Sequence, residues 1–380
     1  MTLEQRIRSL APRAPGVMVA VVDAGGVREQ AAVGSADLVR SNAATASTPW
    51  PWFSMTKVFT VTTAMRMAER GELDLDEPVG EHVPAVLRLR PAAWAERITP
   101  RHLMSHSSGI ANPIPLRWIR RPTDPAPDVE ELAERRLLEH RRLRFAPGTR
   151  AYYTNLGTLV LGALLQRVSR TPFRALVSRE VLVPLGMSRT GFDRPSDAAV
   201  GHHPRWNPMR LLVPQWVVGA SRGRWVTTRP FLVDGPPYGG LVGPLDDLVR
   251  FVRMHLRDGE LDGARVITPA SAAAMRTITT LGRPFDLGLG WFRPHESRRA
   301  APRFSPSSRF ARACGTGLRF SPNSRFARAC GTGPPFVEHL GSGPGFLNVM
   351  RLYPTRGLGV IVLGNATSYD VDAVASLAIT

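Results

Sequence analysis

The sequence predicts an α/β protein of the α+β kind, in which an antiparallel sheet flanked by helices adjoins a central, mostly helical lobe. Two pairs of runs indicate strands: β-branched runs at 16–23 and 27–33 near the start of the chain, and the stretches 346–353 and 357–363 near its end. The long stretch between these pairs has the apolar periodicity of helices. We therefore expect both ends of the chain to pair in one sheet, and the functional site to lie between the sheet and the helical lobe.

The elements follow in order. Residues 16–23 and 27–33 form a hairpin around the glycine turn 24–26. A helix runs from Ser54 to about Arg70, where Gly71 ends it. Thr99 caps a short helix that ends in the segment 105–109. Further helices are expected at 128–142, 155–169 (buried), 171–182, 244–257 and 268–276, with a last one starting near Tyr369.

Composition excludes several classes of protein. The 380 residues are 43% hydrophobic, which is enough for a large core. Two cysteines without a CxxC pair make neither a disulfide scaffold nor a zinc site, so we expect no metal and no cofactor. No apolar run approaches a membrane span of about 20 residues, and the run 17–22 is too short for a secretion signal. These features predict a soluble, cytoplasmic protein.

One arginine-rich stretch differs from the rest of the chain. Residues 304–317 and 320–333 are copies that differ at one position, which indicates a tandem duplication inside a loop. From Arg293 to Pro334 nine arginines accompany one acid, so this segment supplies +8 of the net charge of +18. We expect a flexible insertion, with its two cysteines as incidental copies rather than ligands.

The basic residues are strongly skewed, since 48 of the 49 are arginine and the remaining one is Lys57. Arginine can supply positive charge, but its guanidinium does not lose a proton at any relevant pH. The single lysine is therefore a candidate for chemistry, although a leftover surface lysine is the alternative. Ser54 precedes it by one helical turn, so both side chains lie on one face near a helix N-terminus that could stabilise an oxyanion.

Two further motifs carry candidate functional groups. In Tyr153-Thr154-Asn155, a phenol near a lysine ammonium can become a phenolate, which is a competent general base, and the amide can orient the lysine and a substrate. The alternative is a core tyrosine beside a helix cap. In His339-Leu340-Gly341-Ser342, glycine permits close approach of a substrate to a strand, and a backbone N–H could complete an oxyanion hole. Each motif is weak by itself.

Taken together and in this order, SxxK, YxN and HxG resemble the serine β-lactamase and penicillin-binding-protein superfamily, and specifically the class C β-lactamase-related serine hydrolases, which include D,D-peptidases and esterases. The resemblance covers nearly the whole chain from about residue 15. Other stretches similar to that family are 53–60, 71–79, 103–109, 184–187, 238–241, 287–291 and 363–365. It implies the β-lactamase/transpeptidase-like fold as one catalytic unit over about 15–380. Its parts would be the α/β lobe over 1–60 and 285–380, with the insertion at 304–333, and the helical lobe over 61–284.

The resemblance implies an acyl-enzyme cycle in which Ser54 attacks an ester, amide or lactam carbonyl. Lys57 and Tyr153 would handle the proton, and which of the two accepts it first stays open. Asn155 would orient the substrate and the lysine. The backbone N–H groups of Ser54 and Ser342 would form the oxyanion hole. His339 and Gly341 would line the substrate site, and the segment 106–108 would hold a turn near it.

Departures from the family pattern bear on the substrate. His339 stands where relatives carry the lysine of KTG, and Leu340 replaces a hydroxyl residue, so two groups suited to a substrate carboxylate are missing. An esterase-like hydrolase acting on a small ester or amide is therefore favoured over a β-lactamase or D,D-carboxypeptidase. A non-catalytic binding module is the alternative from a different class.

The positive charge raises the question of anionic partners. Much of the excess lies in the duplicated segment rather than in a patterned patch, so we expect no nucleic-acid binding. Within 202–230, three tryptophans alternate with five arginines, a composition that fits an apolar acyl chain or a membrane surface. The alternative is that the tryptophans are core residues and the arginines are solvated.

Overall fold

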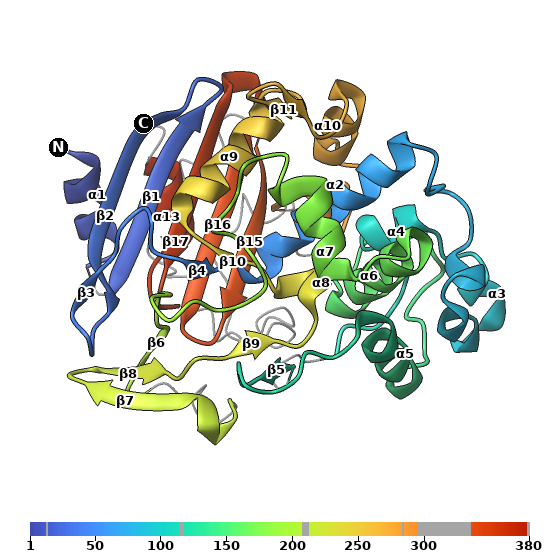
Figure 1. The fold of residues 1–380 in the computed structure, drawn as a ribbon, viewed down its shortest axis with the longest axis horizontal. Coiled ribbons are helices and arrows are strands. Elements are labelled where there is room, and N and C mark those ends of the chain that lie inside the picture. Colours follow the sequence, from blue (N-terminus) through green and yellow to red (C-terminus); the bar gives the residue numbers. More distant parts are fainter. Residues whose placement is uncertain (13, 114–117, 207–212, 283–284, 295–335, 378–380) are drawn as a thin grey trace.

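The two ends of the chain share one sheet, as the sequence predicts. The structure is a computed structural model that describes residues 1–380 except 13, 114–117, 207–212, 283–284, 295–335 and 378–380 (Figure 1). Its main sheet is antiparallel, and β1 pairs with β17 from Val17 opposite Gly364 to Asp23 opposite Leu358. In sheet order the strands are β13 (Phe285–Leu287), β14 (Phe292–Pro294), β15 (Val337–Gly343), β16 (Phe346–Tyr353), β17 (Leu358–Gly364), β1 (Gly16–Asp23), β2 (Val27–Asp37) and β3 (Asn42–Ala43).

Both faces of this sheet are covered, which explains why its central strands are apolar at nearly every position. On one face α1 (Leu3–Leu10) and α13 (Val371–Leu377) cover alternate residues of β1 and β17, such as Val19 and Val362. On the other face α9 (Leu245–Leu256) crosses β1 and β17 (Figure 1), over residues of the opposite parity such as Ala20. Strands buried on both faces read as continuous apolar runs.

The helical lobe packs around α2 (Thr56–Glu69), which contacts both α6 (Asn155–Ser169) and α8 (Pro236–Gly239). Eleven of the fourteen residues of α2 are buried, so this helix has no exposed stripe and lies in the interior between sheet and lobe. Among the described residues, further helices are α3 (Ala92–Ala95), α4 (Pro100–Met104), α5 (Val129–Glu139), α7 (Phe173–Val177) and α10 (Pro269–Arg276), with a π-helical turn at Ser178–Leu182.

Small sheets complete the lobe and its borders. A three-stranded sheet of β6 (His202–Pro204), β8 (Trp225–Thr228) and β7 (Val218–Arg222) extends from the lower edge in Figure 1. The paired short strands are β4 (Trp50–Pro51) with β10 (Val242–Gly243), β5 (Ile119–Arg120) with β9 (Leu232–Val233), and β11 (Glu260–Leu261) with β12 (Ala264–Arg265).

Most of the predicted elements are confirmed, and α6 has the predicted bounds. One prediction is wrong in detail: Ser54 does not open the α-helix but lies in a 3-10 turn, Phe53–Met55, that precedes α2. The helix expected at 128–142 ends at Glu139. Residues 304–333 lie outside the described residues, and the proposed lobe boundaries stay a prediction. Among the described helices, none is long and apolar enough to cross a membrane.

Buried histidines make the fold sensitive to acid. Burial lowers the pKa of His106 and His255 to about 3, and that of His202 and His203 to about 4. In the unfolded chain these histidines become protonated below about pH 6.5, whereas in the folded protein they are protonated only at about pH 3–4. At pH 5 each buried histidine therefore lowers the free energy of unfolding by about 2 kcal/mol relative to neutral pH, since one pKa unit corresponds to about 1.4 kcal/mol.

We therefore expect the free energy of unfolding to fall steadily between pH 7 and pH 5, measured by urea denaturation. His255 offers the matched variant, because its ring lies between Phe251 and Trp291 and neither ring nitrogen has a hydrogen-bond partner. His255→Phe should reduce the loss of unfolding free energy between pH 7 and pH 5 by the contribution of one histidine, about 2 kcal/mol, whatever its effect on stability at pH 8. An unchanged slope in the variant would exclude His255 from the acid response.

Candidate active site

Ser54 lies at the point where the sheet meets the helical lobe, in the 3-10 turn that leads into α2. Its neighbour Phe53 has a φ of 49°, in the left-handed region that residues with a side chain rarely adopt. The ring of Phe53 is held between Phe231, with ring centroids 6.2 Å apart, and Phe346, at 5.6 Å. This packing fixes the backbone of the turn, and Ser54 remains half-buried.

Lys57 joins the turn to the lobe through three hydrogen bonds. Its Nζ donates to Ser54 Oγ at 3.1 Å, to Asn155 Oδ1 at 2.8 Å and to the carbonyl oxygen of Tyr238 at 2.8 Å. The side chain is only 1% exposed. These three uncharged acceptors match the three N–H groups of an ammonium. The structure thus places Lys57 inside the protein and beside Ser54, which excludes the leftover surface lysine.

The segment 153–155 is fixed at the start of α6 by hydrogen bonds to a neighbouring turn. Thr154 caps the helix through its Oγ1, which accepts from the N–H of Gly157 at 3.1 Å. The N–H of Thr154 donates to Nδ1 of His106 at 3.2 Å, and the N–H of Asn155 donates to Oδ1 of Asn112 at 2.9 Å. The turn at 106–108 therefore holds the second motif in place, in the role expected from the sequence.

Tyr153 is half-buried, and its ring is surrounded by the other candidate groups. Nζ of Lys57 lies 4.8 Å from the ring centroid. The rings of His106 and His339 lie 4.7 Å and 6.1 Å away, centroid to centroid. Burial first, and the Lys57 charge second, lower the pKa of His106 to about 3 and that of His339 well below its ordinary value. Both imidazoles are therefore neutral at pH 7.

The third motif forms the strand β15, which runs alongside the Ser54 turn. A Cβ at Gly341 would lie 2.1 Å from the carbonyl oxygen of Trp52, so only glycine permits this approach. The His339 ring is buried, 1% exposed, and its Nδ1 donates to the carbonyl of Leu340 at 2.8 Å. Ser342 is half-buried, with its Oγ donating to the carbonyl of Phe346 at 3.2 Å. The three motifs thus converge, while the roles of their residues stay predictions.

Sequence reasoning missed the groups that hold this arrangement from behind. The carbonyl of Tyr238 was not foreseen as a ligand of Lys57, although the stretch 238–241 resembles the family. Next to it, the carbonyl of Pro237 accepts from Thr60 Oγ1 at 2.6 Å, which ties α8 to α2. Every residue has a backbone carbonyl, so the residue type does not reveal which carbonyl accepts a hydrogen bond, and no sequence signal could have found it. Among the described residues, no cluster of three or more side chains could hold a metal ion.

The close approach at Gly341 gives a test of the geometry. We expect Gly341→Ala to push β15 away from the Ser54 turn and to lower the free energy of unfolding by about 1–3 kcal/mol, the usual cost of overpacking. Any activity that depends on both segments should fall further than stability does. Gly191→Ala is the control, because a Cβ there would meet nothing within 4 Å. Equal thermal stability and activity in the two variants would contradict the close approach.

Comparison with known proteins agrees with the fold. The chain matches the beta-lactamase family over residues 3–379. Protein Rv1367c of Mycobacterium tuberculosis is 34% identical over 270 residues, which cover 63% of each chain. Esterase EstB of Burkholderia gladioli is 30% identical over 265 residues, covering 63% of this chain and 64% of the esterase. The class C beta lactamase of Rhodobacter sphaeroides superposes with a TM-score of 0.67 at 21% identity, over 99% of this chain and 97% of that one.

The fold and the convergence of the three motifs define the class of protein, a β-lactamase-type serine hydrolase fold. The chain belongs to the beta-lactamase family. The resemblance read from the sequence is thereby confirmed, and so is the predicted fold. The aligned part spans less than two thirds of the length of Protein Rv1367c and of EstB.

Proposed function

We propose that this protein is a serine hydrolase that forms an acyl-enzyme on Ser54 and acts on uncharged esters, in the manner of a carboxylesterase. The observation that carries the proposal is the contact between Lys57 Nζ and Ser54 Oγ, buried and held by Asn155 and the Tyr238 carbonyl. Burying a lysine amine costs desolvation free energy, so a buried lysine indicates a role other than keeping the protein soluble. Activating a neighbouring hydroxyl is the chemistry that this contact suits.

In the proposed cycle, Ser54 Oγ attacks the ester carbonyl carbon while its proton passes to Tyr153, which acts as a phenolate beside the Lys57 ammonium. We assign this role to Tyr153 because an ammonium at Lys57, which donates one N–H to Ser54 Oγ, has no lone pair to offer. The carbonyl oxygen becomes an oxyanion, for which the backbone N–H groups of Ser54 and Ser342 are the proposed donors. Tyr153 then protonates the leaving alkoxide, and water repeats the sequence on the acyl-enzyme to release the acid.

The preference for uncharged substrates rests on the third motif. His339 is neutral and buried, because burial and the Lys57 charge lower its pKa. Leu340, half-buried next to it, has no hydroxyl. A substrate carboxylate would therefore find at this strand neither a cation nor a hydroxyl donor from these two side chains. The similarity to Esterase EstB of Burkholderia gladioli agrees with the proposal.

The test is hydrolysis of p-nitrophenyl esters, from acetate to long acyl chains, by the wild type and by Ser54→Ala. We expect turnover by the wild type that Ser54→Ala abolishes. A chromogenic cephalosporin and a D-alanyl-D-alanine peptide, which carry carboxylates, should be turned over more slowly. Faster turnover of either would replace the esterase with a β-lactamase or D,D-carboxypeptidase. No Ser54-dependent turnover of any substrate would leave a non-catalytic binding module.

A further inference from the structure

The three-stranded sheet β6–β8–β7 ends in a basic tip. Residues 201–230, which contain this sheet, include five arginines and no Asp or Glu. Main-chain pairing brings three of the arginines together: the N–H of Arg205 donates to the carbonyl of Arg224 at 2.8 Å, and Arg222 pairs with Trp225 across the β7–β8 turn. All three side chains are exposed. None of them forms an ion pair with a carboxylate of a described residue, unlike many arginines elsewhere on the chain.

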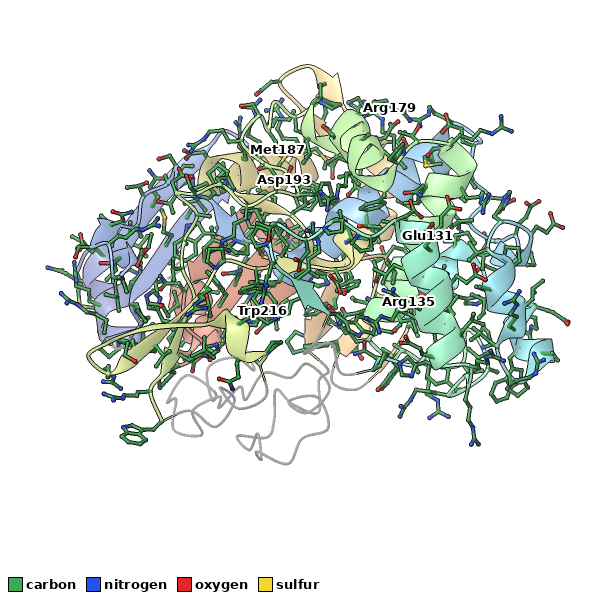
Figure 2. The ribbon with its side chains drawn as sticks, turned by 60° about the horizontal axis from the view of Figure 1, so that its bottom comes forward. Glu131, Arg135, Arg179, Met187, Asp193 and Trp216 are labelled. Atoms are coloured by element: carbon green, nitrogen blue, oxygen red, sulfur yellow. The ribbon has the colours of Figure 1, made fainter. Side chains whose placement is uncertain are left out.

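A tryptophan stands beside these arginines with almost no cover. Trp206 is 91% exposed and directly follows Arg205. The other two tryptophans of the region are packed: Trp225 lies edge-on to His202, with ring centroids 6.4 Å apart, and Trp216 lies under the guanidinium of Arg121 at 5.6 Å. Figure 2 shows Trp216 on the same ribbon as this sheet. The alternative of core tryptophans thus holds for Trp225 and is wrong for Trp206.

We propose that this Arg/Trp tip, formed by Arg205, Trp206, Arg222, Gly223 and Arg224, docks on the surface of an anionic lipid bilayer. Tryptophan favours the membrane–water interface, where its ring meets lipid and its N–H meets water. Each arginine near an anionic surface adds attraction that falls off within a Debye length. A projecting turn presents one aromatic ring and a cluster of charge, whereas a nucleic acid calls for an extended basic stripe or groove.

The tip is firmly connected to the candidate active site. At the root of β6 the N–H of His202 donates to the carbonyl of Gly345 at 3.2 Å and to that of Asn365 at 3.0 Å. Gly345 lies in the turn between β15 and β16, two residues beyond Gly343, the last residue of the strand that carries Ser342. Docking would hold that strand near the bilayer, where esters of lipids are found. This last link rests on the proposed function, but the docking itself does not.

The test is co-sedimentation of the full chain with phosphatidylcholine vesicles, with and without phosphatidylglycerol as one third of the lipid. We expect binding to the anionic vesicles only, and its loss at about 1 M salt, where the Debye length is about 3 Å. Arg222→Gln/Arg224→Gln should weaken binding roughly 30-fold, about fivefold for each arginine. Trp206→Ala should weaken it several-fold and remove most of the quenching of tryptophan fluorescence by brominated lipid.

The matched control is Arg135→Gln/Arg141→Gln, which removes the same charge from exposed positions on and just after α5. Figure 2 labels Arg135 on this helix. It should retain wild-type binding. Equal weakening by both arginine pairs would show attraction by net charge alone and overturn the proposal. So would binding to a DNA duplex that is stronger than binding to the vesicles and unaffected by Trp206→Ala. Hydrolysis of p-nitrophenyl acetate in free solution should be the same in all variants, so a missing esterase activity and a missing docking surface are told apart.

Discussion

Lys57→Arg is expected to lower kcat for ester hydrolysis by about 10²-fold, the order of loss when a reacting group is misplaced by about 1 Å. Arginine keeps the positive charge, but its planar guanidinium cannot place three N–H groups at the tetrahedral angles of an ammonium. The three acceptors around Nζ lie 2.8–3.1 Å from it, in a site where the lysine is 1% exposed. The larger head group would have to displace Ser54, Asn155 or α8. The measurement is kcat on a p-nitrophenyl ester, with thermal stability recorded alongside.

Arg66→Lys is the matched control for this exchange. Arg66 lies on the same helix, is partly buried, and pairs with Glu180 at 2.9 Å, but it is far along the helix from Ser54. The reverse exchange there should cost some stability and leave kcat unchanged. Near-normal turnover by Lys57→Arg would show that only a positive charge is needed at this position, and the inference from the single lysine would then fail.

The sequence was sufficient to predict the main elements of the fold and the groups that meet at the site. The β-branched runs of β1 and β17, the largely apolar run of β16 and the apolar surface of α6 are strong signals, because buried strands and helices read as continuous apolar stretches. The skew toward arginine singled out Lys57, which the structure finds in contact with Ser54. The order of the three motifs carried the resemblance to the family, because three weak patterns in the right order are far more specific than any one of them.

The elements that the sequence did not predict have a common physical cause: their conformation depends on tertiary contacts and not on a local sequence pattern. Strand β15 is rich in glycine and polar residues, and it is a strand because it pairs with β16 from Val337 to Gly343. Strands β13 and β14 have three residues each, too few for a period. Ser54 lies in a 3-10 turn because Phe53 is held in a left-handed conformation by rings from distant segments.

Tyr153→Phe should lower kcat by roughly 10²–10⁴-fold, the usual cost of removing a general base, while leaving the fold intact. Phenylalanine keeps the ring that packs against His106 and lies near Lys57, and it removes only the hydroxyl oxygen. Because Tyr153 is assigned to proton transfer rather than to binding, KM should change much less than kcat.

Tyr152→Phe provides the control in the adjacent position. The ring of Tyr152 lies under the guanidinium of Arg144, with 4.3 Å between the Cζ of Arg144 and the ring centroid, and it is half-buried like Tyr153. Tyr152 has the same hydroxyl, but among the described residues its ring contact is with Arg144 rather than with Lys57. Removing this hydroxyl should therefore leave kcat within about twofold of the wild type, as for a surface substitution. If Tyr153→Phe retained wild-type kcat, the first proton acceptor would have to be a neutral Lys57. The three hydrogen bonds that Nζ donates in this structure would then describe the resting state and not the reactive one.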